Sequence, residues 1–167
     1  VLVYFMFTAE SNAVNLTDGL DGLATGISII AIAPFILFAL MNKQQDVAIT
    51  AVTLIGALVG FLYFNYHPAR IFMGDCGSLA LGGFLAAIAI ITKQELLLLI
   101  VGIVPLLETL SVIIQVVSYK TRKKRVFKMA PIHHHFEMCG WSEVKVVVVF
   151  YGVGFIAGIV GILLGVM

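Results

Sequence analysis

Residues 23–41 read LATGISIIAIAPFILFALM, a run without a single charged side chain. An α-helix needs about 20 apolar residues to cross the roughly 30 Å hydrocarbon core of a bilayer. No water satisfies exposed backbone groups in that core, so a lipid-facing segment has to form its own hydrogen bonds. The alternation of apolar and polar residues that is typical of a strand is missing here. The run therefore predicts a transmembrane helix.

Further apolar runs follow along the chain, at residues 47–64, 79–92, 96–118 and 144–167. The run at 79–92 is short, so we expect it to borrow residues from its flanks or to be partly re-entrant. Of the 167 residues, 61% are hydrophobic and 11% are charged, whereas soluble domains have about 25% charged residues. The sequence predicts one all-α membrane domain, a polytopic transmembrane helix bundle with about five spans.

The first nine residues are apolar but too few to cross a bilayer, and they lack the basic segment of a signal peptide. We interpret them as the end of a further, truncated helix. We therefore expect the sequence to be the C-terminal part of a longer protein.

Lys and Arg are distributed unevenly among the predicted connections. If the helices alternate in direction, the connections 10–22, 65–78 and 119–143 share one side of the membrane. Eight of the ten Lys and Arg residues fall on this side, seven of them within these connections and Lys145 just after the last one, and only Lys43 and Lys93 fall on the other side. Because cytoplasmic loops carry the Lys and Arg excess, the three longer loops are predicted to face the cytoplasm.

The connection 10–22 carries four amide and carboxylate side chains at every third position: Asn12, Asn15, Asp18 and Asp21. Neighbours in this series meet on an α-helix, whereas a 3₁₀-like turn would align all four. Helix caps and turns also use Asn and Asp, but one cap does not need four of them at even spacing. We interpret the segment as a polar ligand-binding wall, with capping as the alternative.

The connection 65–78 contains Asp75, which lies between Gly74 and Gly77 with its carboxylate uncrowded. Mg²⁺ is typically held by one or two carboxylates together with substrate phosphates. Asp75 is therefore predicted to bind a hard cation. The alternative makes Asp75 a turn former and Arg70 an anchor for lipid headgroups.

The connection 119–143 has two parts. Residues 120–128 include six basic side chains, which either bind anionic headgroups or attract a phosphorylated substrate. Three consecutive histidines follow, and they point about 100° apart on a helix, so they cannot all ligate one ion and no zinc site is expected. One or two of these imidazoles could donate to phosphate oxygens: His133, His134 and His135.

Polar groups also occur inside the predicted spans. Glu108, Ser111 and Gln115 share one face of the 96–118 helix, and ionisable groups at that depth face the bundle interior or a water-filled cavity. They predict an interhelical hydrogen bond or part of a substrate groove. The last span contains two Gly-x-x-x-Gly pairs, which pack closely either within the bundle or across a homodimer.

Three motifs carry a resemblance to a known family. They read NAVNLTDGLDGLA at 12–24, FNYHPARIFMGDCGSLALGG at 64–83 and MAPIHHHFEMCGW at 129–141. They closely resemble the phospho-N-acetylmuramoyl-pentapeptide transferases, a branch of the polyprenyl-phosphate N-acetylhexosamine-1-phosphate transferase superfamily. The first two motifs recur across the superfamily, and the histidine motif favours the muramoyl-pentapeptide branch.

The resemblance implies transfer of phospho-MurNAc-pentapeptide from UDP-MurNAc-pentapeptide to undecaprenyl phosphate, which forms lipid I and UMP for peptidoglycan synthesis. It implies Mg²⁺ as cofactor and a multi-pass protein of the bacterial cytoplasmic (inner) membrane, surrounded by lipids and without a nucleic-acid partner. Metal and basic groups suit a reaction that brings two anions together. We expect direct in-line attack of the lipid phosphate, and a covalent aspartyl-phosphate route stays open.

The resemblance also implies roles for single residues at the reacting phosphates. Asp75 is similar to the family's Mg²⁺ ligand. His133 and His134 match histidines assigned to the phosphate region, with Gln115 close by.

Other positions resemble contacts of the nucleotide sugar. Phe72 is similar to the aromatic residue that stacks on the base, and Asn65 to a neighbouring polar contact. The first motif supplies the polar wall, with its last member nearest the uracil: Asn12, Asn15, Asp18 and Asp21.

One feature of the family is missing. Its members also use an adjacent Asp-Asp pair and a Lys from their N-terminal half, and no Asp-Asp occurs here. We expect this chain to carry part of the active site and to be inactive alone.

Two other classes of protein share some of these sequence features. A transporter would also use Asn and Asp at helix ends, but its polar groups should cluster at mid-membrane, where Glu108 is the main example. A structural membrane subunit would leave the three polar loops unexplained.

Overall fold

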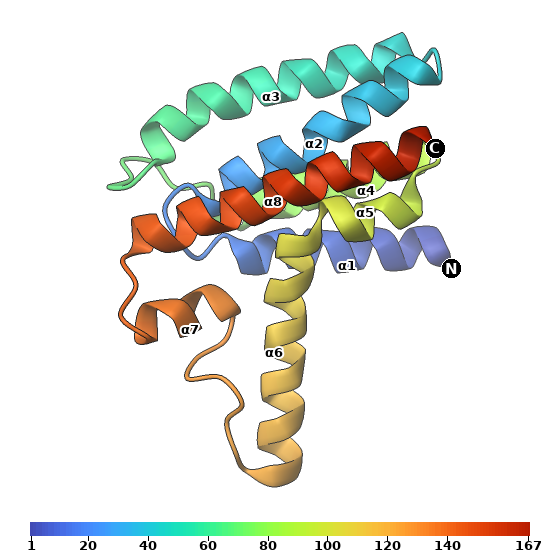
Figure 1. Ribbon diagram of the computed structural model, residues 1–167. Helices are drawn as coiled ribbons and strands as arrows, with labels where there is room; N and C mark the ends of the chain where they lie inside the picture. Colours follow the sequence, from blue (N-terminus) through green and yellow to red (C-terminus); the bar gives the residue numbers. More distant parts are fainter.

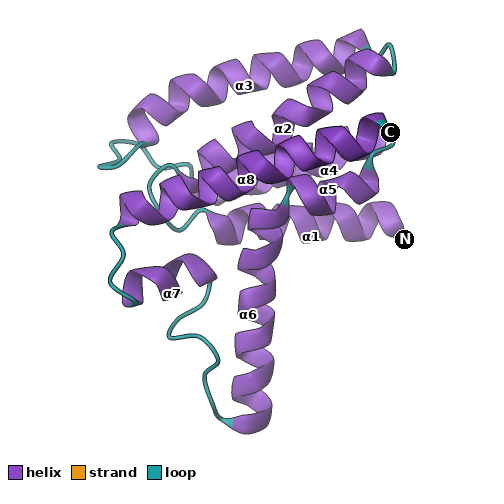
Figure 2. Cartoon of the chain, viewed as in Figure 1, coloured by secondary structure: helices purple, strands orange, loops and turns teal.

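The computed structural model describes residues 1–167 and contains eight α-helices and no strand (Figures 1 and 2). Five of them, namely α2, α3, α4, α6 and α8, are long and apolar enough to cross a membrane. The predicted all-α, polytopic class is confirmed. The helices are α1 (Leu2–Thr17), α2 (Leu23–Met41), α3 (Gln45–Asn65), α4 (Gly74–Ile91), α5 (Glu95–Val101), α6 (Ile103–Arg122), α7 (Ile132–Met138) and α8 (Glu143–Val166).

The connections are shorter than predicted, because helices extend into them. Helix α1 continues to Thr17, so residues 10–17 are α-helical and only 18–22 form a turn. Helix α4 begins at Gly74 and thereby reaches 18 residues, which confirms that the short run at 79–92 borrows residues from its flank. Helix α6 likewise extends to Arg122.

The apolar run at 96–118 was expected to be one helix, and this was wrong. The run breaks at Gly102 into α5 and α6, and α6 points steeply away from the other helices (Figure 1). Pro105 lies in the first turn of α6 and has no N–H to donate to the carbonyl of Val101. Proline is tolerated at such a helix start but interrupts a helix interior.

Two short turns meet at the end of the bundle opposite the polar loops. Lys43 and Lys93 both adopt positive φ angles, 59° and 58°, just after α2 and α4. The side-chain amide of Asn42 donates to the carbonyl of Thr92 at 2.9 Å. This contact places the two turns together, as the alternation of helix directions predicted.

Helix α2 lies at the centre of the bundle and contacts α3, α8, α4 and α1. The glycines of the two Gly-x-x-x-Gly pairs of α8 face inward: a Cβ on Gly161 would come within 2.5 Å of the Val101 side chain, and one on Gly165 within 2.6 Å of Phe38. Small residues let membrane helices approach closely, and the resulting van der Waals packing holds them together. The α8 glycines therefore pack within the bundle, and a homodimer would need another surface.

Candidate functional site

The C-terminal end of α1 lies against the first turns of α4. Gly82 makes this possible, because a Cβ there would lie only 2.4 Å from the carbonyl oxygen of Glu10 and 2.5 Å from the Cα of Ser11. The two backbones thus touch directly. Side chains from the first and second polar motifs are brought together as a result.

Asn15 connects these two motifs. Its Nδ2 donates to the Oδ1 of Asp75 at 3.1 Å and to the Oγ of Ser78 at 2.9 Å. Ser78 in turn donates to the carbonyl of Gly74 at 3.1 Å. Asn15 therefore orients the exposed carboxylate of Asp75, and it does so as a residue of an α-helix.

Asp18, at the end of α1, faces the same carboxylate. Partial burial raises the pKa of Asp18 above its ordinary value, and the negative charge of Asp75 raises it further. The two carboxylates repel each other, and the side chain that connects the two motifs, Asn15, is an uncharged amide. Their negative charge is therefore not compensated. Oxygen donors of this kind are what Mg²⁺ prefers, so the residues fit the cation that the sequence predicted.

Asp21 belongs to a different cluster. Its Oδ2 lies 3.1 Å from the Nδ1 of His67 and accepts the backbone N–H of Ala69 at 2.9 Å. The Oε2 of Glu143 lies 3.2 Å from the same His67 nitrogen, and Oε1 of Glu143 accepts the backbone N–H of Asp21 at 2.7 Å. Three segments that are far apart in the sequence are thus held together.

The Asp21–His67–Glu143 cluster was not predicted as a unit. Its three ligand atoms lie within 4.8 Å of one another, close enough for a metal ion, but hydrogen bonds already connect them. His67 was visible within the second motif. Glu143 was recognisable only as an acidic residue in the first turn of α8.

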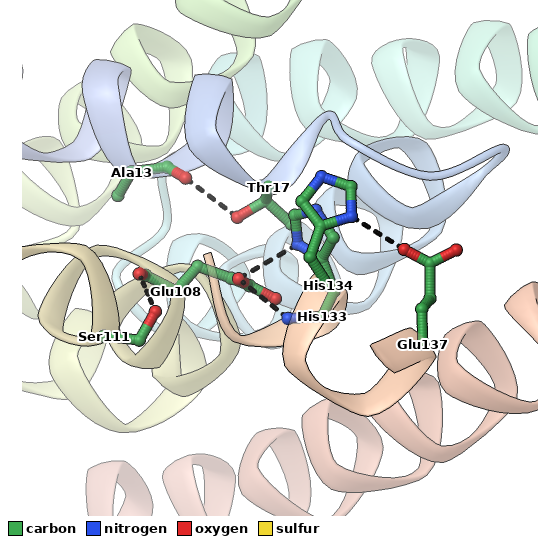
Figure 3. Close-up of polar contacts among 7 residues, drawn as sticks. All are labelled: Ala13, Thr17, Glu108, Ser111, His133, His134 and Glu137. Atoms are coloured by element: carbon green, nitrogen blue, oxygen red, sulfur yellow. Dashed lines mark hydrogen bonds and ion pairs between the residues drawn. The ribbon is translucent and has the colours of Figure 1, made fainter. Parts of the chain in front are cut away.

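The first histidine of α7 is buried. The Nδ1 of His133 lies 3.0 Å from the Oε2 of Glu108, and the backbone N–H of His133 donates to the same oxygen at 3.4 Å (Figure 3). On its other side the ring lies against Gly19, where a Cβ would come within 2.3 Å of His133 Nε2. Glu108 therefore makes an interhelical hydrogen bond within the bundle, one of the two alternatives that the sequence left open.

The next two histidines have different surroundings. The Nδ1 of His134 lies 2.7 Å from the Oε2 of Glu137, and its ring lies over that of His133 with centroids 4.1 Å apart (Figure 3). His135 turns away and accepts the backbone N–H of Lys128 at 3.1 Å. The three imidazoles therefore serve three different contacts.

Two predicted site residues form hydrogen bonds with the protein itself, one at its surface and one in its interior. Asn12 donates to the carbonyl of Thr8 on its own helix at 2.7 Å. Asn65 is buried, where its Oδ1 accepts from Thr25 at 2.6 Å and its Nδ2 donates to the carbonyl of Ile71 at 3.0 Å. Asn65 thus shapes the connection between α3 and α4 and exposes no free polar atom there.

Gln115 holds the chain after α6. Its Oε1 accepts the backbone N–H groups of Val126 and Phe127, each at 3.0 Å, and its Nε2 donates to the carbonyl of Phe127. All of its amide groups are therefore engaged, and it orients the loop that leads to α7.

Phe72 is the most accessible aromatic side chain of the second motif, with 74% of its surface exposed. It borders an apolar groove of about 390 Å³ between α3 and α4, which Phe61, Met73 and Leu81 also line. Its ring is free to stack on a flat ligand.

The chain is similar to curated proteins over nearly its whole length. It is 60% identical over 166 residues to the phospho-N-acetylmuramoyl-pentapeptide-transferase of Bacillus thuringiensis (strain Al Hakam), a match that covers 99% of this chain and 51% of that protein. It is 59% identical to the enzyme of the same name from Bacillus cytotoxicus, with the same coverage. The chain thus spans about half the length of the curated relatives it matches.

A family model matches as well. The model described as glycosyl transferase family 4 covers residues 1–93, which include Asn15, Asp18 and Asp75. This match extends over more than half of the 167 residues, so the chain belongs to glycosyl transferase family 4.

Proposed function

We propose that this chain carries part of the active site of a Mg²⁺-dependent phosphoglycosyl transferase. The enzyme transfers phospho-MurNAc-pentapeptide from UDP-MurNAc-pentapeptide to undecaprenyl phosphate and releases UMP and lipid I. The observation that carries the proposal is the pair of mutually repelling carboxylates, Asp18 and Asp75, at one end of a membrane bundle, where Asn15 donates a hydrogen bond to Asp75. The names of the relatives support the choice of substrates.

Each group has a task that its position supports. Asp75 and Asp18 would hold Mg²⁺, which when bound neutralises phosphate charge and acts as a Lewis acid. Asn15 keeps the Asp75 carboxylate oriented. The exposed ring of Phe72 can stack on the uracil base, and an imidazole of α7 can donate to a phosphate oxygen.

The reaction needs no strong general base, because the acceptor phosphate is already anionic. An oxygen of the lipid phosphate attacks the phosphorus attached to the sugar, and the bond from that phosphorus to the UMP oxygen breaks. Catalysis then consists of positioning the two anions and compensating their charge. A lipid acceptor and a water-soluble donor explain why the site lies at the end of the spans, on the side predicted to be cytoplasmic.

The test is UMP release by the full-length protein in detergent, with both substrates, in the presence of Mg²⁺ or of a chelator. We expect UMP only when both substrates and Mg²⁺ are present. Passage of a substrate across proteoliposomes without UMP production would instead support a transporter.

A further inference from the structure

The first turn of α8 contains a carboxylate, Glu143, to which the proposed reaction gives no task. We propose that Glu143 is a positioning residue: through Asp21 and His67 it fixes the turn after α1, so that Asp18 stays beside Asp75. This inference rests on the proposed function, because both take these two aspartates as the ligands of Mg²⁺.

Glu143 uses both of its carboxylate oxygens. Oε1 accepts the backbone N–H of Asp21 at 2.7 Å, and Oε2 lies 3.2 Å from Nδ1 of His67. Oδ2 of Asp21 lies 3.1 Å from that same nitrogen and also accepts the backbone N–H of Ala69 at 2.9 Å. Glu143 thus reaches Asp21 twice, once at the backbone and once through the ring of His67.

A single proton connects the two carboxylates. An ionised carboxylate can only accept hydrogen bonds, so Nδ1 of His67 carries the proton that faces Oδ2 of Asp21 and Oε2 of Glu143. A carboxylate partner of this kind fixes the proton on one ring nitrogen and orients the imidazole. Glu143 therefore keeps His67 in the form that donates to Asp21.

A second contact from α8 holds the same turn. Tyr151 lies about two turns further along α8, and its hydroxyl donates to the carbonyl of Gly22 at 2.6 Å. The segment is thus held at the N–H of Asp21 by Glu143 and at the carbonyl of Gly22 by Tyr151. Asp18 lies just before this segment, at the C-cap of α1, so its position depends on how the turn is held.

The acidic pair needs such a restraint because its members repel each other. The side chain of Asp75 accepts a hydrogen bond from Asn15, whereas the side chain of Asp18 forms no hydrogen bond with the protein. The negative charge of Asp75 raises the pKa of Asp18, in addition to the larger effect of burial, and pushes the two carboxylates apart. Only the backbone of the turn opposes this repulsion, and α8 holds that backbone.

The test measures Mg²⁺ binding and UMP release in variants of the full-length protein. Glu143→Gln keeps the size of the side chain and an oxygen for the N–H of Asp21. Its amide N–H groups, however, face the N–H of His67, so the ring can no longer donate to Asp21. We expect the Mg²⁺ concentration at half of the rise in apparent melting temperature to increase about tenfold, since a hydrogen bond to a charged group contributes about this factor. The Mg²⁺ concentration for half-maximal UMP release should increase in parallel.

Glu95→Gln is the matched control. Glu95 also lies in the first turn of a helix, but at the opposite end of the bundle. Both Mg²⁺ concentrations should therefore stay unchanged in this variant.

The decisive measurement repeats the change in a second background. His67→Gln should itself weaken Mg²⁺ binding, and Glu143→Gln should add nothing to it, because its effect passes through His67. A purely structural contribution of Glu143 to α8 would lower the melting temperature of the metal-free protein equally in both backgrounds and leave Mg²⁺ binding unchanged. That result would overturn the inference.

The positioning role and the proposed function fail in different ways. Unchanged Mg²⁺ binding in Glu143→Gln and His67→Gln would overturn the positioning role alone, provided that the unmodified protein releases UMP. Absence of UMP release from an unmodified protein that binds Mg²⁺ would overturn the proposed function alone. His67→Gln replaces an exposed side chain and tests the same coupling if Glu143→Gln does not fold.

Discussion

Asp75 and Asp18 are close enough for one charge to disturb the other, although their positions in the sequence are far apart. Asn15 donates to the Asp75 carboxylate, but an amide contributes no positive charge. Neither carboxylate forms a salt bridge with Lys, Arg or His. The pair therefore lowers stability slightly by itself, and a bound cation would compensate its charge.

Replacing the carboxylate that we propose to bind Mg²⁺ should greatly slow catalysis. For Asp75→Asn in the full-length protein we expect kcat for UMP release to fall by about 100-fold or more, since one preorganised charge contact at a transferring group contributes about this much. The Mg²⁺-dependent rise in apparent melting temperature should disappear too. Undiminished turnover in this variant would remove Asp75 from the metal site.

The burial of Asp18 and its repulsion by Asp75 together predict a dependence of stability on pH. The pKa of Asp18 is raised in the folded protein, so the folded state holds this proton more tightly than the unfolded state does. Stability of the metal-free protein therefore falls as pH rises from the ordinary Asp value of about 3.9 through the raised pKa. Addition of Mg²⁺ at neutral pH should restore it.

Asp18→Asn should remove this part of the pH dependence. In the presence of chelator, the decrease in apparent melting temperature from acid to neutral pH should be smaller in Asp18→Asn than in the unmodified protein. Asp46→Asn, at the other end of the bundle, is the control. An identical pH profile for Asp18→Asn and the unmodified protein would contradict the raised pKa of Asp18.

At the scale of the helices, the contact between α1 and α4 positions the acidic pair. Gly82 lies where the backbones of the two helices touch. Gly60 is also a helical glycine of a predicted span, but it has open space around it. The two glycines offer a matched comparison between a packed and an unpacked site.

Gly82→Ala should separate α1 from α4. The added methyl group would collide with the backbone at Glu10 and Ser11, and overpacking of this kind costs about 1–3 kcal/mol. We expect a lower apparent melting temperature and weaker Mg²⁺ binding, because Asn15 moves away from Asp75. Gly60→Ala meets nothing and should leave both unchanged or raise stability slightly. Equal behaviour of the two variants would show that the α1–α4 contact does not position the site.

The break between α5 and α6 changes the shape of the molecule. Helix α6 leaves the bundle at Gly102, and many of its apolar side chains are exposed, among them Leu107, Ile113 and Val117. Its basic end therefore lies apart from the acidic pair, and the chain must return through residues 123–131 before α7 packs against α6 and α8 (Figure 1). Gln115 accepts hydrogen bonds from the backbone of this returning segment, at Val126 and Phe127.

At the scale of the whole molecule, three polar segments meet at one end of the helices. Asp21, His67 and Glu143 connect the turn after α1, the connection before α4 and the start of α8. His133 connects α7 to α6 through Glu108, and to the turn after α1 through its contact with Gly19. The proposed site is thus assembled from separate parts of the chain.

The segment alone should be inactive. It spans 51% of the length of the relatives it matches and contains no adjacent Asp-Asp pair. We expect the 167-residue segment in detergent to release no UMP above a control without enzyme, while the full-length protein does so under the same conditions. UMP release from the segment would mean that the residues described here suffice for catalysis.

The helical class, the spans and the likeness to a family of transferases were determined by the sequence itself. Hydropathy and segment length are local properties, and a membrane allows only helices for apolar runs that satisfy their own backbone. The three motifs likewise made Asp75 and the histidines candidate site residues without any knowledge of their neighbours in space. The position of the helix break was not evident, because Gly102 and Pro105 occur within a continuous apolar run.

The tertiary structure alone decided what each polar residue contacts. The hydrogen bond from Asp21 to Glu143 joins residues 122 positions apart, and no local pattern encodes such a pair. For the same reason the sequence could not show that Asn65 and Gln115 form hydrogen bonds with backbone groups. Nor could it show that His133 is buried in contact with Glu108 while His134 stays accessible. Hydrogen-bond partners depend on how distant helices pack, and here that packing depends on single glycines such as Gly19 and Gly82 that let them touch.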